Sequence, residues 1–254
     1  MHSAFAKESS ISERFHQREA LMKPFMKRFG EPVLVHAVDS EKSFVNILKS
    51  GKIKVPRAGG KTAYMDALLG IGPSIYFSVG FVYATAYGFP YNLVFRLSLL
   101  KELEYYKTSL SYSCYRAVME YWYEQDKDYF RKVWHHDSET ERVIRKYLCV
   151  PFQGKVRRRL DFWRIEAQLK HYIDTYPKKK VLLKLVSEQR SKLRIGIKKA
   201  RFHAIGSLAK KEVPELMCDH DISLSNSAFV GIQIQGKISP RIKRLLSAYQ
   251  SKLI

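Results

Sequence analysis

Side chains able to do chemistry follow one another in a fixed order along the first 150 residues. In chain order they are His36 in a short apolar run, Tyr76 and Ser78 in the stretch "GPSIYFS", and the two carboxylates Glu139 and Glu141. An imidazole and a hydroxyl form hydrogen bonds, an aromatic ring stacks on planar groups, and a carboxylate stabilises positive charge. The competing interpretation is structural: a satisfied core histidine, a packed tyrosine and two solvated charges at the start of a strand.

Other arrangements in the sequence point to no further chemistry. The tetrapeptide "GGKT" has only the end of the phosphate-binding P-loop pattern, because the first glycine of that pattern is missing. The adjacent His135 and His136 point in different directions on a strand and chelate a metal poorly. We expect no metal site, and buried thiols in a reducing compartment, because no CxxC pair occurs among the three cysteines, Cys114, Cys149 and Cys218.

Apolar periodicity and capping signals predict the helices and strands that must position these residues. A first helix is predicted to end near Phe29, before Gly30 and Pro32, and Ser239 with Pro240 is predicted to begin the last helix. The segments 178–186 and 192–202 suit either strands or short helices. This mixture is of the α+β class. The other predicted helices are 40–51, 80–88, two within 100–135, and 157–174. The predicted strands are 32–38, 52–55, 74–78, 91–99 and 227–236, and 139–152 is predicted as one long strand or a pair of strands.

Positive charge is the strongest bulk signal. The chain has 45 Lys and Arg against 24 Asp and Glu, a formal net charge of +21. Residues 151–254 hold 23 basic and 8 acidic residues, or +15, whereas residues 1–150 hold 22 and 16, or +6. A basic half predicts a polyanionic partner such as nucleic acid. The alternative is a basic surface without a specific partner.

Within the basic half, the predicted helix 157–174 interleaves cations with aromatic rings. Such a surface suits phosphate contacts beside stacked bases, although a solvated helix over a core fits equally well. The candidate nucleic-acid-binding residues are Arg157, Arg158, Arg159, Arg164 and Lys170.

Length and hydropathy narrow the class of protein further. The 254 residues are enough for one large domain or two small ones, and a hydrophobic content of 46% argues against global disorder. No apolar run is long enough to span a bilayer, and the N-terminus lacks the apolar region of a secretory signal. We therefore expect no membrane association and a cytoplasmic location.

The ordered set "LVHAV", "FVNILKSGKI", "GPSIYFSVGFVYATAYG" and "ETERVI" resembles the ADP-ribosyltransferase superfamily. It is most similar to the histidine–tyrosine–glutamate branch, which includes small bacterial and phage enzymes, and the resemblance covers residues 31–150. It implies an α+β fold with a split β-sheet core, flanking helices and a basic α/β C-terminal region, with NAD as substrate and no metal. The expected organisation is an N-terminal helix at 1–30, the core at 31–152, and a basic region at 153–254 that completes the same domain or follows it.

The resemblance also implies roles for the candidate residues. Glu141 or Glu139 would stabilise the oxocarbenium-like transition state formed when nicotinamide leaves the ribose. His36 would donate to a ribose hydroxyl, Tyr76 would stack on nicotinamide, and Ser78 would support the glutamate. The remaining candidates for NAD binding act through their backbone and are Gly72 and Ala37.

One position departs from the family pattern: Val38 stands where the family often has threonine or serine. We expect an NAD-dependent mono-ADP-ribosyltransferase that modifies nucleic acid or a nucleic-acid-bound protein, as a bacterial or phage toxin, defence or host-takeover factor. The alternative, which Val38 favours, is a non-catalytic basic protein that keeps the fold and binds nucleic acid or serves a structural role. A nuclease or replication protein is a weaker alternative, because no carboxylate cluster has metal-ligand spacing.

Overall fold

The computed structural model describes residues 11–56, 73–108, 110–133, 172–207 and 213–254. These residues form two compact units. The first comprises the described residues within 11–56, 74–108 and 194–254, and the second comprises residue 73 with 110–133 and 172–193. Helices and antiparallel strands occur together in the chain, so the predicted α+β class is confirmed.

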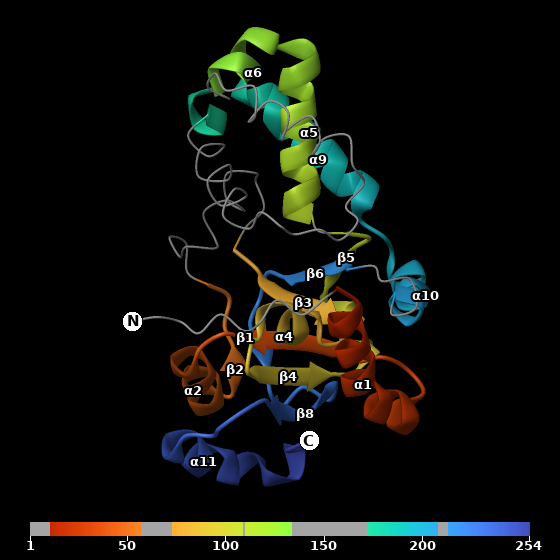
Figure 1. Cartoon of the computed structure of the whole chain (residues 1–254), viewed down its shortest axis with the longest axis vertical. Helices are drawn as coiled ribbons and strands as arrows, with labels where there is room; N and C mark the ends of the chain where they lie inside the picture. The colour runs from red at the N-terminus through yellow and green to blue at the C-terminus, as the bar shows by residue number, and fades with distance from the viewer. Residues whose placement is uncertain (1–10, 57–72, 109, 134–171, 208–212) are drawn as a thin grey trace. The chain divides into compact units, whose positions relative to one another are not determined.

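The first unit is built on a six-stranded antiparallel sheet with the strand order β5-β6-β3-β1-β4-β8 (Figure 1). Strands from the end of the chain pair with strands from its beginning, so residues 213–254 contribute to the same sheet as β1, β3 and β4. A separate antiparallel pair consists of β2 and β7. The strands are β1 (Leu34–Val38), β2 (Lys52–Ile53), β3 (Ile75–Val79), β4 (Tyr91–Phe95), β5 (Glu104–Tyr106), β6 (Glu215–Cys218), β7 (Ile222–Ser223) and β8 (Phe229–Ile234).

The two central strands, β1 and β3, share only a short ladder. β1 pairs with β4 at all five of its positions. It pairs with β3 at two positions, Leu34 with Val79 and Val35 with Ser78. β3 in turn pairs with β6 along its other edge. Beyond Val35 the described sheet is therefore continuous on the β4 side of β1 and interrupted on the β3 side.

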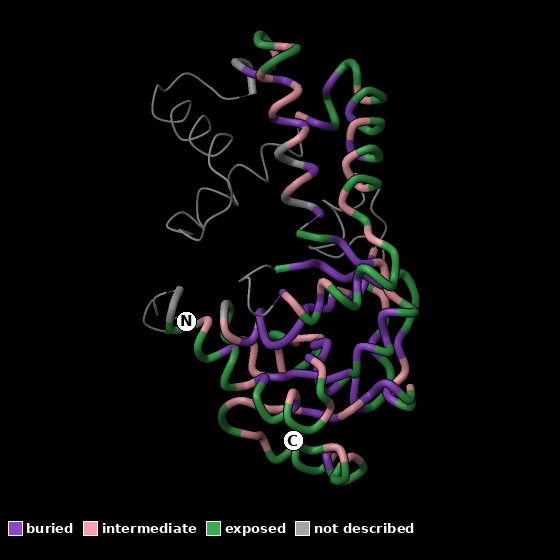
Figure 2. The backbone as a smooth tube through the Cα atoms, turned by 90° about the vertical axis from the view of Figure 1, so that its right-hand side faces the viewer, coloured by how far each residue is buried: buried purple, intermediate pink, exposed green. Residues whose placement is uncertain are grey.

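Helices cover both faces of this sheet, and long buried stretches run along its strands (Figure 2). Side chains alternate between the faces, so Val35 and Val94 join a smaller core under α1 and α4, whereas Leu34 and Leu93 join a larger core on the other face. The larger core is enclosed by α2, η1, α10 and α11. The helices of this unit are α1 (Ile11–Phe29), α2 (Glu41–Ser50), α4 (Val82–Tyr87), η1 (Leu97–Glu102), α10 (Ile197–Ser207), α11 (Pro240–Leu246) and η2 (Ser247–Lys252).

Capping residues fix several helix ends where the sequence predicts them. The Ser40 side chain accepts a hydrogen bond from a first-turn N–H of α2, and Ser239 does the same for α11. Gly30 follows α1 with a φ of 68°, and Gly51 follows α2 with a φ of 63°. Glycine adopts this left-handed conformation without the steric cost that a Cβ brings. The predicted ends of α1 and α2 and the predicted start of α11 are confirmed.

Other elements differ from the prediction. The predicted strand 91–99 ends at Phe95, because the chain turns into the 3-10 helix η1 and buries Leu97, Leu99 and Leu100 there. The two segments that suited either strand or helix form α9 (Lys179–Leu193) and α10. The short strands β5 and β6 are absent from the predicted set. The predicted strand 139–152 and most of the predicted helix 157–174 lie outside the described residues.

The described part of the second unit is helical and contains α5 (Leu110–Gln125), α6 (Lys127–Val133) and α9, which confirms the two helices predicted within 100–135. Trp122 is buried and contacts the rings of Tyr129 and Tyr176. The Asp126 carboxylate accepts hydrogen bonds from the Tyr129 N–H at 3.2 Å and the Tyr176 hydroxyl at 2.9 Å. This unit therefore has an aromatic core of its own. Among the described residues, no helix has both the length and the apolar composition needed to cross a membrane.

Candidate functional site

His36 connects β1 to β3 where the ladder between them has ended. Its Nδ1 lies 2.9 Å from the carbonyl oxygen of Tyr76, and its ring lies 5.6 Å, centroid to centroid, from the ring of Phe77. A carbonyl oxygen can only accept, so Nδ1 carries the proton in this bond. The imidazole thus replaces a backbone ladder bond and holds the two strands in register at the point where they part.

The environment of His36 keeps its imidazole neutral. Burial lowers the pKa of His36, and the hydrogen bond to the Tyr76 carbonyl opposes that shift. With the proton on Nδ1, the neutral ring presents Nε2 as a hydrogen-bond acceptor. No described residue forms a hydrogen bond with Nε2. A ligand hydroxyl would therefore donate to Nε2, which reverses the direction expected from the sequence.

The backbone of Ala37 faces β3 without a ladder partner among the described residues. The Gly80 N–H donates to the Val33 carbonyl at 2.8 Å, which shows that the backbone groups of Val33 point toward β3. Backbone groups alternate in direction along a strand, so those of Val35 and Ala37 point the same way. Val35 is the last residue of the ladder with β3. The N–H and C=O of Ala37 are thus one donor and one acceptor side by side, the pattern that a primary carboxamide complements.

The two predicted residues on β3 lie close to this interruption. Tyr76 is half-buried, and its carbonyl oxygen accepts from His36. Ser78 is buried, and its hydroxyl donates to the Gly80 carbonyl at 2.8 Å rather than to a carboxylate. The structure therefore brings the backbone and side-chain groups of His36, Ala37, Tyr76 and Ser78 onto two neighbouring strands. The other predicted site residues, Gly72, Glu139, Glu141, Arg157, Arg158, Arg159, Arg164 and Lys170, lie outside the described residues.

Glu215 is a candidate that the sequence reasoning missed. It is the first residue of β6 and is 8% exposed, which makes it the only buried carboxylate among the residues that the structure describes. Leu216 pairs with Phe77 on β3, and one further step of this register places Glu215 beside Ser78. Burying a carboxylate lowers the stability of the fold unless hydrogen bonds or opposite charges compensate it. Buried ionisable groups are therefore frequent at functional sites. The sequence signal was a glutamate that opens the short apolar run "ELMC".

The Glu215 carboxylate interacts electrostatically with the hydroxyl of Tyr83 on α4. Burial raises the pKa of the Tyr83 hydroxyl most strongly, and the nearby Glu215 carboxylate and Tyr87 raise it further. The Tyr83 and Tyr87 rings stack on each other with centroids 5.7 Å apart, as their spacing of one helical turn predicts. Tyr87 is 46% exposed. The carboxylate therefore lies in an aromatic, partly desolvated environment at the start of β6.

Comparisons with protein-family models, curated proteins and solved structures gave no match to this chain.

Arg18 brings a buried positive charge to the end of β3. One of its Nη atoms donates to the Val79 carbonyl at 3.1 Å, whereas its buried Nε has no hydrogen-bond partner. Burial lowers the pKa of Arg18 to about 10, and the nearby Glu19 and Tyr105 oppose that shift, so the guanidinium stays charged at neutral pH. Arg18 lies four residues before the buried Met22, so helical periodicity alone predicts that this arginine shares the apolar face of α1.

A basic and aromatic surface lies on α10. Phe202 is 80% exposed and borders a hollow of about 380 Å³. Among the described residues the lysines of this hollow form no ion pair, in contrast to the neighbouring Arg201, which pairs with Glu31 at 2.8 Å. None of the residues around His36 or Glu215 lines the hollow. Its lining residues are Lys107, Ile195, Lys198, Lys199, Phe202 and His203.

The described cysteines are buried, as the sequence predicts. Cys114 and Cys218 are buried and form no disulfide, and Cys149 lies outside the described residues. Burial raises the pKa of the Cys218 thiol to about 11. A protonated, buried thiol is a poor nucleophile, so Cys218 does not support covalent catalysis.

Proposed function

We propose that this protein is an NAD-dependent mono-ADP-ribosyltransferase that modifies nucleic acid or a protein bound to nucleic acid. The observation that carries the proposal is the buried carboxylate of Glu215 at the start of a strand paired with β3. The order of a histidine strand, a tyrosine strand and a glutamate strand is the one that the sequence resemblance requires. The glutamates that the resemblance matched, Glu139 and Glu141, lie outside the described residues. Within the described sheet Glu215 fits the glutamate position, and the interrupted ladder between β1 and β3 fits a split sheet.

The interrupted ladder also provides the groups that NAD needs. The nicotinamide carboxamide would donate to the Ala37 carbonyl and accept from the Ala37 N–H, beside the stacking ring of Tyr76. A ribose hydroxyl would donate to Nε2 of His36. Because these contacts come from strands rather than loops, the ribose is held in one orientation before reaction.

Glu215 supplies the electrostatic part of the mechanism. As the bond between ribose C1′ and the nicotinamide nitrogen breaks, its electron pair leaves with nicotinamide and positive charge develops on the ribose. A carboxylate held in a partly desolvated site stabilises that charge more strongly than one in water. A lone pair of the acceptor then forms the new bond to C1′, and the proton that the acceptor loses passes to Glu215 or to solvent.

The surface on α10 supports nucleic acid as the acceptor or as the molecule that carries it. Lys107, Lys198 and Lys199 would contact phosphates, and the exposed ring of Phe202 would stack on an unpaired base. Aromatic stacking on bases requires that they be unpaired, so this surface fits a single strand better than a duplex.

Label transfer from NAD tests this proposal. Wild-type protein and Glu215→Gln would be incubated with NAD labelled in the ADP-ribose part and with single-stranded DNA, single-stranded RNA, duplex DNA or cell lysate, followed by nuclease or protease treatment. Glu188→Gln, an exposed carboxylate change on α9, is the matched control. We expect transfer by wild type and Glu188→Gln, and its loss in Glu215→Gln. If the wild type binds NAD or nucleic acid but transfers no label, the result would support the alternative of a non-catalytic basic protein that keeps the fold. The valine at position 38 is consistent with that alternative.

A further inference from the structure

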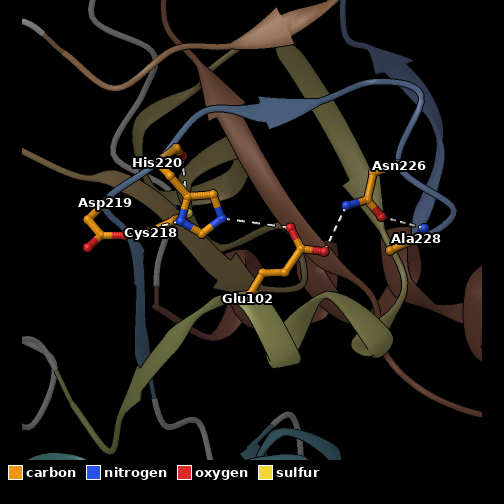
Figure 3. Close-up of polar contacts among 6 residues, drawn as sticks. All are labelled: Glu102, Cys218, Asp219, His220, Asn226 and Ala228. Atoms are coloured by element: carbon orange, nitrogen blue, oxygen red, sulfur yellow. Dashed lines mark hydrogen bonds and ion pairs between the residues drawn. The ribbon is translucent and has the colours of Figure 1, made fainter.

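Three metal-ligating side chains converge where β6 ends. They belong to the consecutive residues Cys218, Asp219 and His220 (Figure 3). The His220 Nδ1 lies 3.4 Å from the Cys218 Sγ and 3.1 Å from an Asp219 carboxylate oxygen. The three donor atoms all lie within 4.8 Å of one another. One nitrogen, one sulfur and one oxygen therefore face a common point.

These separations suit a tetrahedral metal ion. Zinc lies about 2.3 Å from a thiolate sulfur and about 2.0–2.2 Å from an imidazole nitrogen or a carboxylate oxygen. At tetrahedral angles such donors are about 3.3–3.6 Å apart. The observed distances of 3.4 Å and 3.1 Å lie near these values. The remaining pair, the Cys218 Sγ and the Asp219 carboxylate, lies within 4.8 Å, so the exposed Asp219 side chain would rotate to bring its oxygen to the ion. The Cys218 thiol now donates to the His220 carbonyl at 3.2 Å, and an ion would replace this thiol proton when it binds Sγ.

The other side of the imidazole has the support that metal-bound histidines usually have. The His220 Nε2 lies 3.8 Å from one carboxylate oxygen of Glu102 on η1. The side-chain amide of Asn226 donates to the other oxygen of Glu102 at 2.9 Å, and its own oxygen accepts from the Ala228 N–H at 2.8 Å. Figure 3 shows Glu102 between His220 and Asn226. Metal-ligating histidines commonly donate their second ring N–H to a carboxylate that is itself hydrogen-bonded.

We propose that Cys218, Asp219 and His220 bind one divalent ion of the zinc class, with water as the fourth ligand and Glu102 orienting His220. The combination of sulfur, imidazole and carboxylate ligands selects zinc or a similar borderline-soft ion over magnesium or calcium. Asp219 and His220 are exposed, which leaves a path for the ion to enter. The site departs from the expectation of no metal, because that expectation considered neither the Cys-x-His spacing nor the fold that brings Glu102 beside it.

The bound ion would hold the end of β6 against η1 without taking part in NAD chemistry. Cys218 lies at the opposite end of β6 from Glu215. An ion that binds the folded chain more tightly than the unfolded chain raises the melting temperature. The site is therefore proposed as structural, and it stands whether or not the protein uses NAD.

Cobalt titration of the reduced full-length protein tests the site, because Co²⁺ replaces Zn²⁺ and bonds between cobalt and thiolate absorb in the near ultraviolet. We expect this absorption with one equivalent of Co²⁺, its loss on adding Zn²⁺, and a higher melting temperature with either ion. Cys218→Ser should abolish the absorption, and His220→Gln should abolish tight binding. Glu102→Gln should weaken the affinity about 10–100-fold.

Two controls separate the site from other thiols and from the proposed catalysis. Cys114→Ser removes the other described buried thiol and should leave the titration unchanged. Glu215→Gln should bind cobalt like the wild type even though it loses label transfer. Absence of cobalt–thiolate absorption in the wild type, or its persistence in Cys218→Ser with an unchanged melting shift, would overturn the proposal. His220→Gln changes an exposed side chain, so it remains informative if Cys218→Ser folds poorly.

Discussion

The imidazole Nδ1 of His36 lies 2.9 Å from the backbone carbonyl oxygen of Tyr76 and bridges β1 and β3 just beyond their last ladder pair. This bond fixes the tautomer of His36 and leaves Nε2 as an acceptor. It also marks the place where Ala37 turns its backbone groups toward β3 without a ladder partner among the described residues. The histidine thus positions the strand edge and provides a ligand-binding atom of its own.

The stability of the first unit should depend on pH through His36. The unfolded chain binds the histidine proton near pH 6.5, whereas burial lowers the pKa of His36 in the folded chain. Between these two values the unfolded state holds more protons, so the free energy of unfolding falls as pH is lowered through 6.5, by up to about 1.4 kcal/mol per pH unit. Above pH 6.5 this contribution is fully present. Urea denaturation of wild type and His36→Gln from pH 7.5 to pH 5 should show a smaller slope in the variant, and equal slopes would contradict the account.

Arg18 should lower the free energy of unfolding of the first unit. Its Nε is buried without a partner, and an unsatisfied buried polar group costs about 1–3 kcal/mol. Arg18→Met removes the buried charge and the unpaired donor but also the 3.1 Å bond to the Val79 carbonyl. Because burying a charge costs more than one hydrogen bond contributes, the free energy of unfolding should rise by about 1 kcal/mol. Arg241→Met, an exposed change on α11, should have little effect. Urea denaturation measures both, and a less stable Arg18→Met would show that the guanidinium has a favourable role.

Single-stranded nucleic acid should bind the surface on α10. The double variant Lys198→Glu with Lys199→Glu should weaken binding and reduce the slope of log affinity against log salt by about 1–2. Phe202→Ala should cost about 1–3 kcal/mol of binding free energy for single strands through lost stacking. Lys243→Glu, an exposed change on α11, is the matched control. A salt series with fluorescent oligonucleotides measures these effects, and equal effects of all the lysine changes would indicate a diffuse electrostatic surface.

Gly231 on β8 should tolerate no side chain. A Cβ at this position would collide with the Lys252 carbonyl oxygen and the Ile254 side chain. The Ile254 N–H donates to the Ile232 carbonyl at 3.0 Å, so the chain end must move away from β8. We expect Gly231→Ala to lower the free energy of unfolding by about 1–3 kcal/mol. Gly206→Ala, where a Cβ meets nothing within 4 Å, should be neutral or stabilising, and similar melting temperatures for both variants would contradict this prediction.

The sequence predicted the elements whose signals are local. The helix ends at Gly30 and Gly51, the strand that carries His36 and the turn from Tyr76 into α4 all follow from capping, periodicity and residue type. The resemblance to a transferase family rested on these same local stretches. They cover the part of the candidate site that lies on β1 and β3.

The other side of the candidate site depends on pairing between distant segments. β6 has only four residues, so it offers too little alternation for a strand prediction. Its pairing with β3 brings together residues about 140 positions apart, which no local pattern reports. Glu215 is therefore an inconspicuous glutamate in the sequence and a buried carboxylate in the fold. The contact between Glu102 and His220 also joins distant segments, so the sequence could not predict it.

The most direct test of the central claim is the rate of nicotinamide release from NAD by wild type, Glu215→Gln and Glu188→Gln in the presence of single-stranded oligonucleotides. Loss of one preorganised electrostatic group commonly lowers the catalytic rate about 10²–10³-fold. We predict a loss of this size in Glu215→Gln with NAD binding retained, and a wild-type rate in Glu188→Gln. Equal rates for all three proteins, or no release by the wild type with any acceptor, would contradict the proposal that Glu215 is the carboxylate of an ADP-ribosyltransferase.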